Sequence, residues 1–220
     1  MGKFKKALTA AVAGVGVAAW WWRKNPSACP YNQRFWVEAP HPFITRQRLL
    51  ATLTPRAGER ILEIGPGTGY YTLDVAQALQ PGGGLEIFDL QQEMLDHIMR
   101  RAAKDRMTNI VAKQGDARQL PYEDSSFDAV YLVTVLGEIP DRTAALREIR
   151  RVLKPEGRVV IGELFGDPHM VTAKRLRAEA EEAGFSFVER RGPAFGYFAR
   201  FAPALTTRSD RPAICGESGT

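Results

Sequence analysis

A glycine-rich turn between an apolar strand and a helix is the feature that most constrains the fold of this chain. The segment Glu63-Ile-Gly-Pro-Gly-Thr-Gly69 begins at the end of a predicted buried strand, residues 60–64, and precedes residues 70–79, whose apolar positions recur at helical spacing. Glycine permits a tight strand-to-helix turn and lets a ligand approach the backbone. Asp89 ends the next predicted strand, where a carboxylate can accept hydrogen bonds from ribose hydroxyls. The pattern predicts an adenosine-containing ligand at the carboxyl ends of parallel strands.

Strands and helices alternate along most of the 220 residues. We predict strands at residues 60–64, 85–88, 109–112, 127–133, 158–161, 185–189 and 195–201. We predict helices at residues 44–53 and 70–79, and around 94–102, 146–153 and 176–183, with Pro155 and Gly184 ending the last two. The alternation predicts an α/β fold with a mostly parallel sheet and helices on both faces. The last two strands have no helix between them, so the C-terminal strand is expected to be antiparallel.

The spacing of the glycines separates two classes of cofactor. A dinucleotide-binding turn requires a third small residue at the position of Tyr70, which is large. The carboxylate of Glu63 would repel a pyrophosphate, whereas it would attract a cationic sulfonium cofactor with a free amino group. The second class is therefore favoured.

Residues 44–201 resemble the class I S-adenosylmethionine-dependent methyltransferases, especially those of ubiquinone and menaquinone synthesis. Besides the glycine turn, the chain contains the segment Gly115-Asp116-Ala117-Arg118-Gln119-Leu120-Pro121, then Phe127-Asp128 and the turn 153–157, in the order typical of that family. The resemblance implies a Rossmann-like, seven-stranded sheet and S-adenosyl-L-methionine as the cofactor. It implies that the methionine part of the cofactor is held by Glu63, Gly65, Gly67 and Gly69. It also implies that Asp89 binds the ribose, that Leu90 touches the adenine, that Asp116 binds the adenine amino group, and that Ala117 backs it.

Methyl transfer mainly requires that the enzyme align the acceptor and exclude water, so a catalytic base is not always needed. A base is needed only where the acceptor must lose a proton. The candidates are Glu138 after the fourth strand, His169 beyond the fifth and His41 in an aromatic segment before the domain. Alternatively, Glu138 caps the helix that starts near Asp141, and His169 is a loop residue. The choice of base stays open, and no metal site is predicted.

The positive charge of the chain is concentrated at its beginning. Residues 1–37 hold six basic residues and no acidic one, whereas the rest carries a net charge of −1. Residues 7–22 are uncharged and include Trp20, Trp21 and Trp22; as a helix they would span about 24 Å, somewhat less than a hydrocarbon core of about 30 Å. We predict an N-terminal apolar helix, residues 1–24, that anchors the protein to a membrane. A cleaved signal peptide, disfavoured by the Arg23-Lys24 pair, and a helix packed on the domain are the alternatives.

The chain is thus expected to comprise the anchor, an aromatic and proline-rich connector (25–43), a methyltransferase domain (44–202) and a loose tail (203–220). The nearly neutral domain argues against a nucleic-acid partner. We expect a small-molecule acceptor that is apolar or resident in the membrane, such as a lipid, quinone or isoprenoid, and an enzyme on the cytoplasmic side of the membrane. The alternative is another user of the same cofactor scaffold, such as an aminopropyl transferase or a non-catalytic binder. The oligomeric state stays open.

Overall fold

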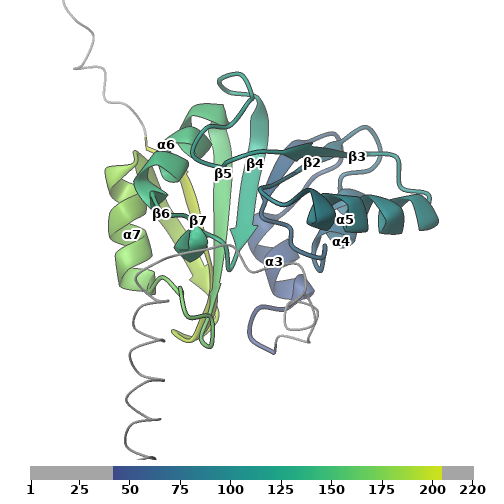
Figure 1. The fold of residues 1–220 in the computed structure, drawn as a ribbon. Helices are drawn as coiled ribbons and strands as arrows, with labels where there is room; N and C mark the ends of the chain where they lie inside the picture. Colours follow the sequence, from purple (N-terminus) through teal and green to yellow (C-terminus); the bar gives the residue numbers. More distant parts are fainter. Residues whose placement is uncertain (1–41, 205–220) are drawn as a thin grey trace, which may run out of the picture.

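The computed structural model describes residues 42–204, which form one sheet covered by helices on both faces (Figure 1). The strands are β1 (Arg60–Ile64), β2 (Gly84–Asp89), β3 (Ile110–Gln114), β4 (Phe127–Val133), β5 (Leu153–Leu164), β6 (Phe185–Arg191) and β7 (Gly196–Pro203). The helices are α3 (Arg46–Leu53), α4 (Thr72–Ala78), α5 (Gln92–Lys104), α6 (Arg142–Val152) and α7 (Ala173–Glu182), with a short 3-10 helix, η2 (Leu136–Glu138).

The seven strands lie in the order β3-β2-β1-β4-β5-β7-β6. Strands β1 to β5 pair in parallel, and β7 is antiparallel to both β5 and β6. The predicted mostly parallel, seven-stranded sheet with an antiparallel C-terminal strand is confirmed. The strand order reverses at β1: β2 and β3 lie on one side of it, and β4 and β5 lie on the other. In open α/β sheets, ligands bind at the carboxyl ends of the strands beside such a reversal.

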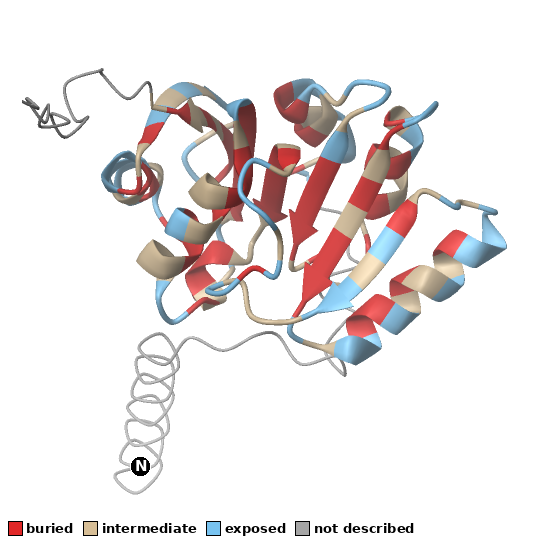
Figure 2. Ribbon diagram, turned by 90° about the horizontal axis from the view of Figure 1, so that it is seen from above, coloured by how far each residue is buried: buried red, intermediate tan, exposed pale blue. Residues whose placement is uncertain are grey.

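Apolar side chains fill both faces of the sheet, as the buried strands in Figure 2 show. Helices α3, α4 and α5 pack on one face around Leu49, Val75 and Ile98, and α6 and α7 pack on the other around Ile149 and Leu176. Strand β4 is central and, apart from Asp128, is an apolar run because both of its faces are covered.

Several boundaries differ from the prediction, and three of the differences have a visible physical reason or consequence. Strand β5 starts at Leu153 rather than at residue 158: Phe127 pairs with Leu153 and Ala129 with Arg158, so the predicted turn lies within the strand as a bulge. Helix α3 starts at Arg46 because the Thr45 side chain accepts the Arg48 N–H at 3.2 Å. Strand β7 continues to Pro203, the first residue of the expected tail.

Among residues 42–204, no helix is long and apolar enough to cross a membrane. The predicted anchor at 1–24, nearly all of the connector, His41 and the tail from residue 205 lie outside the described residues.

Candidate cofactor and acceptor site

The loop between β1 and α4 adopts a backbone conformation that requires glycine. Gly65, Gly67 and Gly69 have φ values of 64°, 56° and 77°, in the left-handed region. A Cβ on Gly65 would overlap the side chain of Val135, and a Cβ on Gly69 would lie 2.9 Å from Cγ1 of Ile98. The glycines therefore serve both the turn and the close approach of neighbouring elements.

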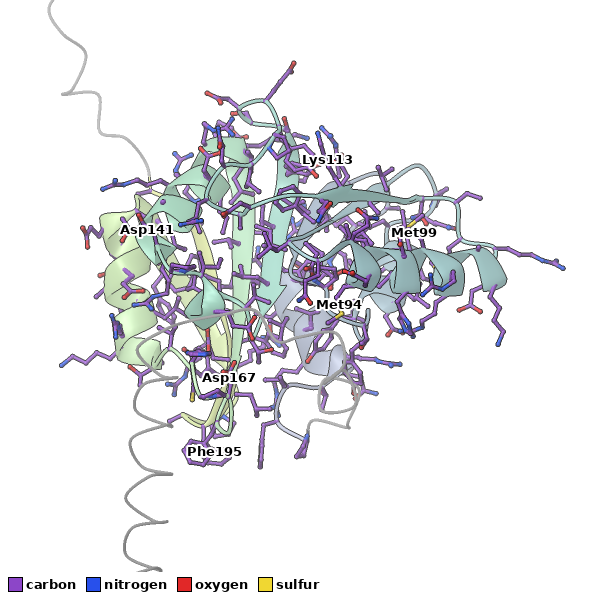
Figure 3. The ribbon with its side chains drawn as sticks, in the orientation of Figure 1. Met94, Met99, Lys113, Asp141, Asp167 and Phe195 are labelled. Carbon is purple, nitrogen blue, oxygen red and sulfur yellow. The ribbon has the colours of Figure 1, made fainter. Side chains whose placement is uncertain are left out.

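A cavity of about 360 Å³ opens beside this loop, at the carboxyl ends of β1, β2 and β4. Of the predicted cofactor-binding residues, those that line it are Glu63, Gly65, Gly67, Asp89, Leu90, Asp116 and Ala117. Gly69 is the exception, and it supports the turn from outside the cavity wall. Figure 3 labels Met94 of α5, which also lines the cavity, in the middle of the molecule. Residues from four separate segments thus meet in one site.

Asp89 lies at the end of β2 with its carboxylate in the cavity wall. Its Oδ1 accepts the N–H of Gln91 at 2.8 Å, and the side chain is largely buried. Burial raises the pKa of Asp89, and hydrogen bonds from the backbone N–H groups of Gln91, Gly67 and Leu90 oppose the rise. The backbone therefore fixes the orientation of a carboxylate that can accept hydrogen bonds from a diol.

Glu63 is almost completely buried on β1 and also lines the cavity. Its Oε2 accepts the hydroxyl of Thr72 at 2.7 Å. Burial and, to a smaller degree, the nearby charge of Asp89 raise the pKa of Glu63 to about 7, against the hydrogen bonds from Thr72 and Tyr131 that lower it. An ammonium or sulfonium group bound here would relieve both effects, so the two carboxylates fit a cationic cofactor that also carries a ribose.

The third carboxylate, Asp116, has a partner that the sequence interpretation did not include. Its Oδ2 lies 2.6 Å from Nη2 of Arg118, and both residues line the cavity. The Arg118 guanidinium lowers the pKa of Asp116. This ion pair lies where the resemblance implies contact with the adenine amino group. The exposed side chain of Leu90 stands on the same rim.

Glu138 is the candidate base that reaches the cavity, from η2 after β4. It does not cap α6, because Asp141 is the N-cap residue and its Oδ1 accepts the N–H of Ala144 at 2.9 Å. The helix-cap alternative for Glu138 is therefore wrong, and its role as a base stays a prediction.

His169 is absent from the cavity wall. Its N–H donates to Oδ1 of Asp167 at 2.7 Å, its ring is buried, and its carbonyl packs so closely on Gly137 that a Cβ there would overlap it. The structure therefore places His169 beneath η2, where it supports the segment that carries Glu138. His41 lies outside the described residues.

The sequence interpretation also missed most of the apolar wall of the cavity. This wall comprises Ile44, Tyr70, Tyr71, Met94, Val133, Val135, Ile139 and Pro140. Tyr70 was noted only as too large for a dinucleotide turn, yet its ring lies in the site, with the Arg46 guanidinium 4.4 Å from its centroid. Within residues 42–204, no group of His, Cys and acidic side chains could hold a metal ion.

A reversing parallel sheet with an antiparallel seventh strand, a glycine loop and two buried carboxylates together define a Rossmann-like cofactor-binding domain. Residues 61–157 match the family described as "Methyltransferase domain". Residues 61–157 are therefore a methyltransferase domain by sequence, and residues 42–204 have the fold of S-adenosylmethionine-dependent methyltransferases, whose cofactor is S-adenosyl-L-methionine.

Two further comparisons locate the domain among known proteins. A demethylmenaquinone methyltransferase of Staphylococcus aureus is 37% identical over 135 residues, which cover 61% of this chain and 55% of that protein. The chain thus spans about half the length of the curated relatives it matches. A SAM-dependent methyltransferase from Aquifex aeolicus superposes with a TM-score of 0.72 at 17% identity, over 79% of this chain and 98% of its own. The cyclase SpnF shares the fold with a TM-score of 0.64 at 19% identity, over 72% and 79% of the two chains.

Proposed function

We propose that this protein transfers a methyl group from S-adenosyl-L-methionine to a quinone-like, apolar acceptor that resides in a membrane. The observation that carries the proposal is the uneven wall of the cavity. The carboxylates Glu63 and Asp89 and the glycines line it beside β1 and β2, whereas the part of the wall that carries Glu138 after β4 is mostly apolar, with Val133, Val135, Ile139 and Pro140. The name of the Staphylococcus aureus relative supports a demethylated menaquinone as the acceptor class.

The chemistry assigns separate tasks to the two parts of the wall. The bound cofactor supplies an electrophilic methyl group on a sulfonium sulfur. Glu63 and Asp89 would hold its ammonium and ribose groups, while Tyr70 and Ile139 would exclude water and orient a flat apolar ring.

The redox state of the acceptor follows from the same chemistry. A quinone ring is itself electrophilic, so the acceptor must be in its reduced, hydroquinone form. A ring carbon of the acceptor would take the methyl group, S-adenosylhomocysteine would leave, and the acceptor would lose one proton. In this proposal the carboxylate of Glu138 accepts that proton.

The proposed location follows from the acceptor and from residues 1–24. An apolar segment flanked by basic residues would hold the protein at a membrane surface, where an isoprenoid quinone is dissolved. The domain would face the cytosol, where the cofactor is made.

The test is a transfer assay with the full chain and methyl-labelled cofactor. The acceptors are a reduced demethylated naphthoquinol with an isoprenoid tail, its oxidised form and a total membrane lipid extract. We expect label in the reduced naphthoquinol and none in the oxidised form, with Asp89→Ala as the inactive control. If the label appears only in another lipid fraction, the acceptor is not quinone-like and belongs to the class of that fraction. Tight binding of S-adenosylhomocysteine without label in any fraction would favour a non-catalytic binder.

A further inference from the structure

Three phenylalanines gather on the surface of the domain although they come from distant parts of the chain. Phe165, Phe195 and Phe43 are 75%, 47% and 37% exposed, which is unusual for side chains of this size. Phe43 precedes α3, Phe165 follows β5, and Phe195 precedes β7. We call these three residues the phenylalanine cluster.

Specific contacts hold the phenylalanine cluster together. The rings of Phe43 and Phe195 meet edge to face, with centroids 4.7 Å apart and an interplanar angle of 89°. The N–H of Phe165 donates to the carbonyl of Phe195 at 2.7 Å. A Cβ on Gly196 would overlap the side chain of Phe43, so this glycine permits the close packing. The exposed rings are therefore part of an ordered surface.

The phenylalanine cluster lies at the same edge of the sheet as the cavity. Leu164 at the end of β5 pairs with Gly196 at the start of β7, which places Phe165 and Phe195 at the carboxyl end of β5. Ile44, the residue after Phe43, lines the cavity. Figure 3 shows Phe195 projecting at one extremity of the molecule, beyond Asp167. A flat apolar phase touching these rings would lie beside the proposed acceptor site.

Two basic residues follow Phe43 in the chain. Arg48 donates to the carbonyl of Phe43, and Arg46, exposed in the same turn of α3, pairs with Asp74 at 3.3 Å. The half-buried carboxylate of Asp167 accepts the N–H of His169. The chain preceding Phe43 is 42 residues long, and its first 37 residues hold six basic residues, no acidic one and all four tryptophans. The cluster thus stands where a basic, tryptophan-rich segment enters the domain.

From this placement we infer that the folded domain itself docks on an anionic lipid bilayer by inserting the phenylalanine cluster, with the cavity facing the membrane. The inference rests on the membrane location in the proposed function and extends it, because it assigns a second, separate contact to the domain. Exposed aromatic side chains gain free energy at the boundary between head groups and acyl chains, and basic side chains add attraction to anionic lipids.

The first experiment locates the contact directly. In the full chain with Cys29→Ser and Cys215→Ser, a polarity-sensitive fluorophore is attached at Phe165→Cys or, as the matched control, at Val111→Cys. Val111 is 59% exposed on β3, at the opposite end of the strand order. With vesicles of equimolar phosphatidylglycerol and phosphatidylcholine, we expect a blue shift at residue 165 and quenching by brominated acyl chains, with neither at residue 111. A silent probe at residue 165 on vesicle-bound protein overturns the inference and leaves the anchoring by residues 1–24 intact.

The second experiment measures the contribution of the cluster. Phe165→Ser with Phe195→Ser should weaken partitioning into these vesicles about tenfold or more, and Val111→Ser should leave it unchanged. The melting temperature without vesicles should not fall in the double variant. A lower melting temperature with unchanged partitioning would mean that the chain's own residues 25–41 cover the cluster, which overturns the inference. If the wild-type chain does not bind vesicles at all, both the inference and the proposed membrane location fail, while methyl transfer can still be assayed in detergent.

Discussion

In the half of the sheet formed by β1, β2 and β3, the carboxylates Glu63 and Asp89 face the cavity. In the half formed by β5, β7 and β6, Glu163 also lies near the carboxyl end of its strand, but it is outside the cavity wall. Its Oε2 accepts the N–H of Val171 at 3.0 Å, and the side chain is 1% exposed. Glu163 therefore holds the loop between β5 and α7 against the sheet.

The difference arises from the loops at the ends of the two strands. After β1 a glycine loop turns away and leaves open space beside the strand end, so a buried carboxylate there can meet a ligand. After β5 the loop folds back over the strand end, and β7 pairs antiparallel beside it. The same residue type at a similar position thus serves binding in one half and structure in the other. The match to the methyltransferase family, residues 61–157, ends within β5 and leaves β6 and β7 outside.

The largest effect is expected for Asp89→Ala in the cofactor half. Loss of two hydrogen bonds to a charged acceptor, each worth about 2 kcal/mol, should weaken S-adenosylhomocysteine binding about a thousandfold, as measured by calorimetry. Asp96→Ala on the exposed face of α5 is the matched control and should bind normally. Undiminished affinity in Asp89→Ala would refute the assignment of the site.

Glu138→Gln tests whether the segment after β4, between the two halves, contributes a base. The amide cannot accept a proton, so kcat should fall about a hundredfold while cofactor affinity stays the same. Glu93→Gln, exposed on α5 and outside the cavity wall, is the control and should retain kcat. An unchanged kcat in Glu138→Gln would rule out Glu138 as the base.

Glu63→Gln should separate binding from stability. Cofactor affinity should fall about tenfold, because the ammonium group loses its charged partner. The pKa of Glu63 rises from 4.5 to about 7 on folding, so its stabilising contribution is full below pH 4.5 and is lost as the pH rises through 7. The unliganded variant should therefore be more stable than wild type at pH 8, by up to roughly 3 kcal/mol, with little difference at pH 4. Thermal denaturation that showed the same difference at both pH values would contradict the raised pKa.

The smallest functional effect is expected for Glu163→Gln. Glutamine keeps an acceptor for the Val171 N–H, and the residue does not line the cavity, so cofactor affinity should change by less than about twofold. Burial raises the pKa of Glu163, so the carboxyl group stabilises the fold at low pH and loses that contribution as the pH rises. The variant should melt at a higher temperature than wild type at pH 8. A large loss of affinity would instead make the second half part of the cofactor site.

The sequence predicted the cofactor half in more detail than the other half. Strands β1 and β4 occupy the predicted residues, and the glycine loop places Glu63 and Asp89 in one cavity, as its pattern indicated. The bulge that lengthens β5 was missed, because it depends on how residues 153–158 pair with β4. The position of His169 was missed too, since it is set by packing on Gly137 in a different segment.

By itself, the sequence determined the glycine turn, the alternation of strands and helices, and the class of cofactor, because these depend on residues close together in the chain. Only the tertiary structure decided which side chains from distant segments meet. Val135 packs on Gly65 because β4 pairs with β1, and Phe43, Phe165 and Phe195 meet because β7 pairs with β5 beside the start of α3. Such contacts follow from strand order and register, which local patterns do not encode.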